Sequence, residues 1–173
     1  MIVFDLETIP SERALAARDA LWRPDWRGED DFVRYCSTHP ALCQIAAACT
    51  YDTEERITDP GKKMTGGEKR IIGLLDEIIG RSGVVTFNGG GFDLPVIAHR
   101  SRVLGIDVPQ FIPRALAQKP WESGPHYDMA QIMRGGSGRM QSLQSYAIAY
   151  GLSDPKAGDV SGSGVYEAWT AGR

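Results

Sequence analysis

Apolar segments with two different periods alternate along this chain, and this alternation restricts its fold more than any other feature. Residues 1–6, 42–51 and 84–87 are apolar runs that favour strands. Between the second and third runs, Glu68–Ile79 places isoleucine and leucine on one broad helical face and charged residues on the other. Strands that alternate with helices predict an α/β fold, with a layered sheet covered by helices.

Helical patterns recur at five further places. They are Ser11–Leu21, Phe32–Cys36, Asp93–Leu104, Asp128–Met133 and Ser142–Tyr150. Ser11 is expected to cap the first of these, and Gly105 to end the third. Three segments carry no periodic pattern and are expected to form turns or irregular loops: Asp52–Lys63, Pro109–His126 and Ser153–Arg173.

The totals suit one globular domain of 173 residues. The sequence shows no apolar run of about 18 residues and no secretion signal, so a cytoplasmic protein without membrane contact is expected. Three cysteines, Cys36, Cys43 and Cys49, have no zinc-site spacing and are expected to be buried or free thiols.

The net charge of −3 argues against a protein that grips duplex nucleic acid through bulk electrostatics. A nuclease is still compatible with it, because an active site that holds divalent cations needs an acidic cluster of its own. Between Leu94 and Tyr150 basic residues outnumber acidic ones, and this segment is either a backbone-contacting face or an ordinary solvated surface. Those basic residues are Arg100, Arg102, Arg114, Lys119, Arg134 and Arg139.

Asp5 and Glu7 are the first candidates for chemistry. A strand sends every second side chain to the same face, so both carboxylates are expected on one side of the first strand. Their mutual repulsion would be relieved by a hard divalent cation such as Mg²⁺ or Mn²⁺. Taken alone, the pair is more typical of a solvated strand end than of a metal site.

A second cluster joins a strand to a helix through Asn88 and three glycines, and it places Asp93 at the helix start. Glycines there let a backbone approach a ligand closely, although the run lacks both the dinucleotide-binding fingerprint and the Walker lysine. Asp93 alone could be a helix-start residue favoured by the helix dipole.

Taken together, these motifs resemble the first two motifs of the DEDD (DnaQ-like) exonuclease superfamily. The motif residues run from Asp5 to Thr8 and from Phe87 to Pro95, with Arg100 after them. The closest likeness is to the predicted 3′-5′ exonucleases related to the proofreading domain of family B DNA polymerases. The likeness implies a ribonuclease-H-like mixed sheet flanked by helices, and two-metal hydrolysis of single-stranded DNA or RNA to nucleoside monophosphates.

The resemblance also implies roles for individual residues. Asp5, Glu7 and Asp93 would be the catalytic metal ligands for two Mg²⁺ or Mn²⁺ ions. The main chain at Leu6 and Thr8 would lie beside the 3′-terminal nucleotide of the single strand. Two side chains, Asn88 and Phe92, would hold its sugar or base, and Phe92 could equally be a core residue.

The third motif of these enzymes, a tyrosine or histidine followed by an aspartate on a final helix, is absent between Tyr166 and Arg173. Asp128 lacks the spacing of that motif and is interpreted as a helix-start residue. We therefore expect a domain that lacks the final helix. Three explanations fit: a segment of a longer active enzyme, which is favoured; a last helix supplied by a protein partner or a second copy; and a catalytically weak or inactive nucleic-acid-binding module. Use of the fold on a small phosphodiester is a further, less favoured alternative.

Overall fold

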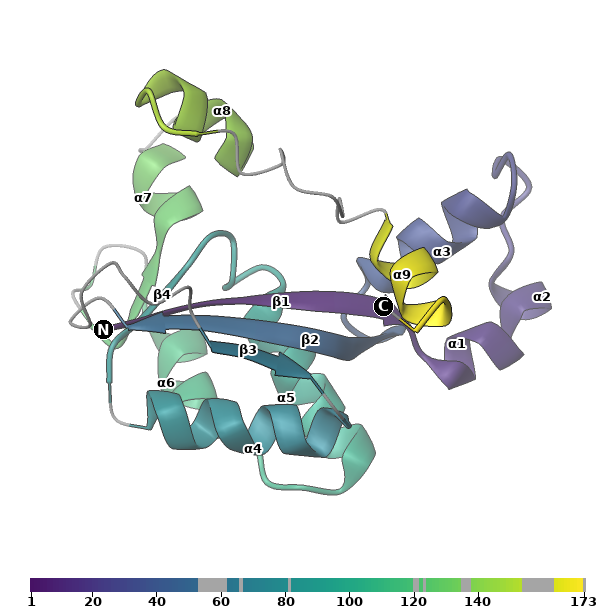
Figure 1. Cartoon of the computed structure of the whole chain (residues 1–173), viewed down its shortest axis with the longest axis horizontal. Coiled ribbons are helices and arrows are strands. Elements are labelled where there is room, and N and C mark those ends of the chain that lie inside the picture. Colours follow the sequence, from purple (N-terminus) through teal and green to yellow (C-terminus); the bar gives the residue numbers. More distant parts are fainter. Residues whose placement is uncertain are drawn as a thin grey trace.

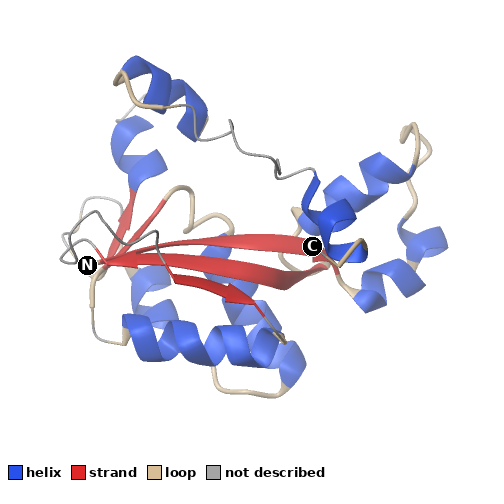
Figure 2. Cartoon of the chain, in the orientation of Figure 1, coloured by secondary structure: helices blue, strands red, loops and turns tan. Residues whose placement is uncertain are grey.

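A computed structural model describes residues 1–52, 62–65, 67–80, 82–119, 122, 124–134, 138–153 and 164–172. Its centre is a five-stranded mixed sheet with the order β3-β2-β1-β4-β5 (Figure 2). The strands are β1 (Ile2–Pro10), β2 (Cys43–Asp52), β3 (Lys62–Thr65), β4 (Val84–Thr86) and β5 (His126–Asp128). β2 is antiparallel to both β1 and β3, whereas β1, β4 and β5 run parallel.

The helices of the described part of the chain vary greatly in length. They are α1 (Glu12–Ala16), α2 (Arg18–Leu21), α3 (Glu29–Ser37), α4 (Glu68–Ile79), α5 (Asp93–Leu104), α6 (Phe111–Ala117), α7 (Met129–Arg134), α8 (Leu143–Ala149) and α9 (Val165–Thr170). The helices α4, α5 and α6 cover one face of the sheet, and α9 packs on β1 from the other side (Figure 1). None of these helices is long and apolar enough to cross a membrane.

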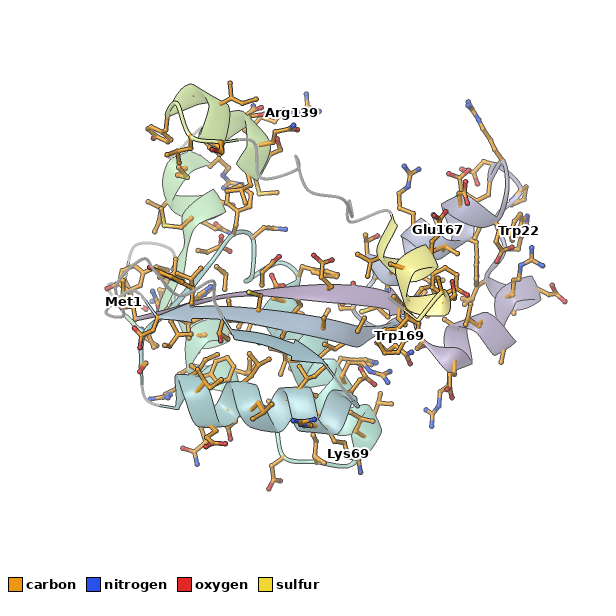
Figure 3. All side chains as sticks on the ribbon, viewed as in Figure 1. Met1, Trp22, Lys69, Arg139, Glu167 and Trp169 are labelled. Carbon is orange, nitrogen blue, oxygen red and sulfur yellow. The ribbon has the colours of Figure 1, made fainter. Side chains whose placement is uncertain are left out.

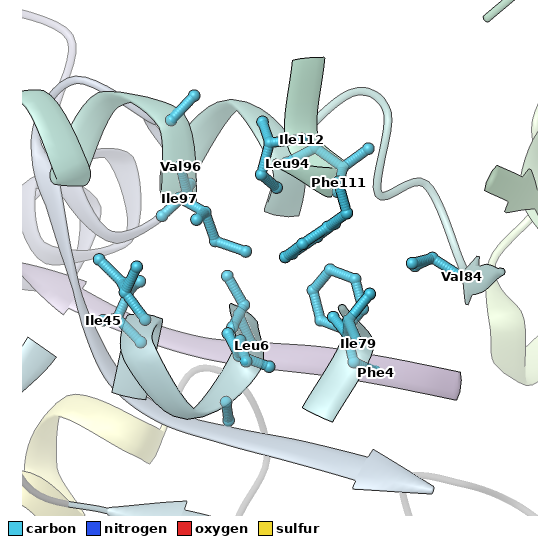
Figure 4. Close-up of a cluster of buried hydrophobic side chains, with 14 of the residues drawn as sticks. Phe4, Leu6, Ile45, Ile79, Val84, Leu94, Val96, Ile97, Phe111 and Ile112 are labelled. Carbon is cyan, nitrogen blue, oxygen red and sulfur yellow. The ribbon is translucent and has the colours of Figure 1, made fainter. Parts of the chain in front are cut away.

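The main core lies between the sheet and helices α4, α5 and α6 (Figure 4). Phe4 and Leu6 point into it from β1, and the Phe4 ring meets the Phe111 ring edge-on at 6.2 Å between centroids. Since side chains alternate along a strand, this burial turns Asp5 and Glu7 to the opposite face of the sheet.

A buried ion pair ties α4 to α5. The guanidinium of Arg100 donates two hydrogen bonds to Glu68, at 2.9 and 2.6 Å, and Glu68 also accepts one from the Ile45 backbone N–H at 2.7 Å. Arg100 is only 7% exposed, so both surface interpretations of its segment, the backbone-contacting face and the solvated surface, are wrong for this residue. The Arg100 guanidinium instead neutralises Glu68 in the interior of the fold.

The strongest patterns in the sequence are confirmed by the structure. α4 and α5 have the predicted bounds, and Gly105 ends α5 in the left-handed conformation with φ of 65°. Ser11 caps α1 by accepting a hydrogen bond from the Ala14 N–H at 3.2 Å. The helix that Ser11 begins is broken at Ala17 into α1 and α2, which the sequence did not predict.

Two segments predicted to be irregular contain regular elements. Pro109–His126 includes α6, where Pro113 is the third helical residue. Proline is tolerated there because the first N–H groups of a helix have no intrahelical acceptor. Ser153–Arg173 includes α9, a helix of 6 residues that is too short to show a period. The strands β3 and β5 were also missed, because each is held by its neighbour in the sheet.

Candidate active site

Asp5 and Glu7 lie on the face of β1 that the main core does not cover. Both residues are exposed, whereas their neighbours Phe4 and Leu6 are buried. The register of β1 with β2 shifts between Glu7 and Thr8, where β2 carries one extra residue. Such a bulge bends a strand locally and redirects side chains, as is common beside active sites.

Asp93 reaches the same region from a different part of the chain. β4 runs parallel to β1, with Val3 opposite Val85, so the chain that leaves β4 enters the space beside Asp5. A short loop then leads to Asp93, the first residue of α5, whose side chain is only 4% exposed. The crevice outside the carboxyl ends of parallel strands is where ligands bind in sheets of this kind.

Asp5 lies within electrostatic reach of both Glu7 and Asp93. Burial and, after it, the negative charge of Asp5 raise the pKa of Asp93 to about 7. Surrounding protein atoms partly desolvate Glu7 and, with the charge of Asp5 as the second cause, raise its pKa. The same partial desolvation raises the pKa of Asp5, although both side chains still reach solvent. A hydrogen bond from the Leu6 backbone opposes part of the rise for Asp5 and Asp93. Asp5 therefore acts electrostatically on both other acids.

The loop between β4 and α5 is packed against itself. A Cβ atom at Gly89 would overlap the Thr86 side chain, and one at Gly91 would lie 2.8 Å from Asn88 Oδ1. Asn88 has a φ of 65° and is the one non-glycine residue with positive φ among the described residues. The glycines thus serve contacts within the loop, a requirement that the sequence could not distinguish from close approach of a ligand.

The four residues expected to contact substrate lie in different settings. The side chain of Leu6 is in the core, which leaves only its main chain available. The Thr8 hydroxyl donates a hydrogen bond to the Ser37 carbonyl at 2.7 Å and so attaches β1 to the end of α3. Phe92 is half-buried against the main core, and Asn88 is half-buried in the loop. Their contacts with a nucleotide remain predictions.

The donor chemistry fits a hard divalent cation, because carboxylate oxygens are the ligands that Mg²⁺ and Mn²⁺ prefer and these acids repel one another. In the part of the chain that the structure describes, no three His, Cys, Asp or Glu side chains are arranged to hold an ion. Asp5, Glu7 and Asp93 thus do not form a three-ligand ion site in the described part of the chain.

Comparison with known families connects this geometry to a protein class. The profile of a family described as "Predicted 3'-5' exonuclease related to the exonuclease domain of PolB" matches residues 30–173. The chain belongs to this family. Asp93 lies within the matched residues of this exonuclease family, and Asp5 and Glu7 precede them. No curated protein sequence matches the chain.

Solved structures share the fold of this PolB-related exonuclease domain. The family B DNA polymerase of Pyrobaculum calidifontis matches with a TM-score of 0.59 and 16% identity, over 98% of this chain and 20% of the polymerase. Escherichia coli exonuclease I with a 5cy-dT13 oligonucleotide matches with a TM-score of 0.53 and 13% identity, over 89% of this chain and 36% of that one. The zinc-bound exonuclease I–ssDNA complex of Escherichia coli matches with a TM-score of 0.54 and 14% identity, over 92% of this chain and 36% of that one. The chain thus spans about a fifth to a third of these proteins, and the predicted ribonuclease-H-like mixed sheet is confirmed.

Asp128 has more contacts than the sequence predicted. Asp128 does begin α7, as expected, by accepting a hydrogen bond from the Ala130 N–H at 3.1 Å. It also accepts hydrogen bonds from the loop that leads to Asp93, at Asn88 N–H and Gly90 N–H. No sequence pattern signals these contacts, because 38 and 40 residues separate the partners.

Proposed function

We propose that this domain is a metal-dependent 3′-5′ exonuclease that hydrolyses single-stranded DNA or RNA to nucleoside monophosphates. The observation that supports the proposal is the parallel pairing of β1 with β4, which brings Asp93 beside Asp5, while Glu7 lies two residues from Asp5 on the same exposed face of β1. The family membership supports the direction of hydrolysis. Exonuclease I, which shares the fold, is known in complex with a single-stranded oligonucleotide.

The protein's own residues would place the reacting groups. Asp5 and Glu7, exposed on the face of β1 opposite the main core, would face the scissile phosphate, and the main chain at Leu6 would lie beside the terminal sugar. Asp93 would be one ligand of the two Mg²⁺ or Mn²⁺ ions, together with Asp5 and Glu7. When bound, such ions activate an attacking water and stabilise a leaving 3′ oxygen. Asp93 must lose its proton to become a ligand, so cation affinity should rise with pH through about 7.

The distribution of exposed charge favours one path for the strand. α3 and α9 line a groove of about 660 Å³ in which acidic residues outnumber the one basic residue, Arg34; the acids are Glu29, Asp30, Asp31 and Glu167. Phosphates would be repelled there. Arg139, just before α8, is exposed, and Figure 3 shows Arg139 and Glu167 on different sides of the molecule. The strand should therefore leave the carboxylates towards α7 and α8.

The direct test is release of nucleoside monophosphates from 5′-labelled single strands with Mg²⁺ or Mn²⁺. Asp5→Ala should abolish the release. Glu77→Gln is the matched control, because Glu77 is an exposed carboxylate on α4, the helix that packs on the other face of the sheet. Parallel DNA and RNA strands of one sequence identify the polymer, and competition by dinucleotides against longer oligomers tests the small-phosphodiester alternative.

A second candidate function is strand binding without hydrolysis, since the described acids do not form a closed cage around an ion. It predicts binding of a labelled oligonucleotide that survives both Asp5→Ala and chelation with EDTA. Binding of that kind, together with no release of monophosphates by the wild-type protein, would replace the exonuclease proposal by this one.

A further inference from the structure

The carboxylate of Asp128 fixes the loop that leads to Asp93. Asp128 Oδ1 accepts a hydrogen bond from Asn88 N–H at 2.8 Å, and Oδ2 accepts one from Gly90 N–H at 3.1 Å. A third, from Ala130 N–H, holds the same side chain at the start of α7. Asp128 is only 8% exposed, so water competes little for these bonds.

A second contact between β4 and β5 holds Gly89, the residue between Asn88 and Gly90. The Thr86 hydroxyl accepts a hydrogen bond from Gly89 N–H at 3.1 Å and lies 2.8 Å from His126 Nε2. Since His126 and Asp128 both belong to β5, this one short strand reaches three successive residues of the loop, directly or through Thr86.

The loop in turn fixes the start of α5. The Asn88 carbonyl accepts hydrogen bonds from the N–H groups of Gly91 and Phe92, at 3.0 and 3.1 Å. The Gly89 carbonyl accepts one from Leu94 N–H at 2.9 Å, so Asp93 lies between two residues that the loop binds. A shift of the loop would therefore move Asp93.

The backbone of Asn88 explains why hydrogen bonds from outside the loop are useful. The hydrogen bonds that join Asp128 and Thr86 to the Asn88–Gly90 loop form a clamp. The Asn88 φ of 65° lies in the left-handed region, which costs free energy for a residue with a side chain. The neighbouring glycine also restricts the clamp, since a Cβ atom at Gly90 would lie 3.2 Å from Asp128 Oδ2. The loop holds this conformation because the surrounding contacts over-determine it.

We infer that Asp128 is a positioning residue of the active site, which holds the Asn88–Gly90 loop and thereby sets the placement of Asn88 and Asp93. The inference rests on the proposed exonuclease function. Asp128 thus does more than begin α7, and this positioning role depends on the two acceptor oxygens of its carboxylate. A carboxylate has two oxygens for these three N–H groups, whereas an amide has only one.

The first experiment compares Asp128→Asn with the wild-type protein. Loss of one acceptor should free the loop and lower kcat by about 100-fold, the scale expected when catalytic groups are displaced by about 1 Å. Hydrogen exchange should accelerate at least about tenfold at the Asn88 or the Gly90 amide, whichever loses its acceptor, while exchange in β1 and β2 stays unchanged. Asp107→Asn, at an exposed carboxylate after α5, is the matched control and should leave kcat unchanged.

Thr86 provides a second pair of variants in case Asp128→Asn does not fold. Thr86→Val removes the acceptor of Gly89 N–H and should also lower kcat and accelerate exchange at the Gly89 amide. Thr86→Ser restores the hydroxyl and should recover both quantities relative to Thr86→Val. Recovery is the result that a loss of packing alone would not give.

The outcomes separate the positioning role from the proposed function. Wild-type kcat in Asp128→Asn with fast-exchanging loop amides would overturn the inference, and so would unchanged exchange at Asn88 and Gly90. If the wild-type protein releases no nucleotides, the exonuclease proposal fails, whereas the exchange rates still test the clamp. Slow catalysis with a mobile loop and an unchanged melting temperature would support the inference.

Discussion

Asp93 lies within the electrostatic field of Asp5. Burial is the larger cause and the charge of Asp5 the second, and together they raise the Asp93 pKa from 3.8 to about 7. An acid whose pKa is raised on folding binds its proton more tightly in the folded state, so the unfolded state holds fewer protons between pH 4 and 7. Asp93 should therefore destabilise the metal-free fold as pH rises through that window.

The size of this effect predicts the behaviour of Asp93→Asn. A rise from 3.8 to about 7 corresponds to about 4 kcal/mol at most. Above pH 7 the variant should be more stable than the wild-type protein by up to that amount, and the gain should vanish near pH 4. Urea unfolding in EDTA at pH 4, 6 and 8 measures it. An equal gain at all three values would show that Asp93 titrates normally.

Divalent cations should make the wild-type protein more stable than Asp93→Asn above pH 7, the reverse of the order expected without metal. Mn²⁺ binds the ionised carboxylates, so it should raise the melting temperature of the wild-type protein more at pH 8 than at pH 6. Asp93→Asn should lose most of this shift and Glu77→Gln should keep it. Thermal unfolding with and without about 5 mM Mn²⁺ provides the measurement. This concentration should exceed the dissociation constant of a weak site. Equal shifts in both variants would place the cation elsewhere.

The buried pair of Arg100 and Glu68 should matter for stability rather than for substrate. Arg100→Met leaves the Glu68 carboxylate buried without its cation, which should cost about 3–5 kcal/mol. Adding Glu68→Gln removes the stranded charge, so the double variant should recover part of that loss. A double-mutant cycle from urea unfolding tests this, and strictly additive losses would show that the two side chains act independently.

Two glycines should respond in opposite ways to alanine. Gly73 lies within α4 with open space around its missing side chain, so Gly73→Ala should stabilise the protein by roughly 0.5–1 kcal/mol. Gly89→Ala would press a methyl group against Thr86 and should destabilise by about 1–3 kcal/mol. Equilibrium unfolding compares them directly. A neutral Gly89→Ala would mean that the loop can move without cost.

The fold could be predicted where a period is carried by a long segment. Glu68–Ile79 repeats its apolar face over about three turns, and Asp93–Leu104 is bounded by an acid and a glycine, so both helices were predicted with their observed bounds. α9 and β5 have 6 and 3 residues and give no such signal. They form because neighbouring elements supply contacts from far along the chain, which a local pattern does not contain.

The candidate site divides in the same way. Strand alternation alone placed Asp5 and Glu7 on one side of β1, and their exposure follows from the burial of Phe4 and Leu6. By contrast, Asp128 was interpreted only as a helix-start residue, and Arg100 was assigned to a surface. Their partners, Asn88 and Glu68, lie 40 and 32 residues away, beyond the reach of any local pattern.

The sequence by itself determined the α/β class, the two longest helices and the shared face of Asp5 and Glu7, because each depends on the period of a single segment. Only the tertiary structure decided that Asp93 becomes a neighbour of Asp5. The parallel pairing of β1 with β4 brings it there, and burial then makes its charge costly enough to raise its pKa to about 7. Pairing and burial are properties of the assembled sheet, so no single segment encodes them.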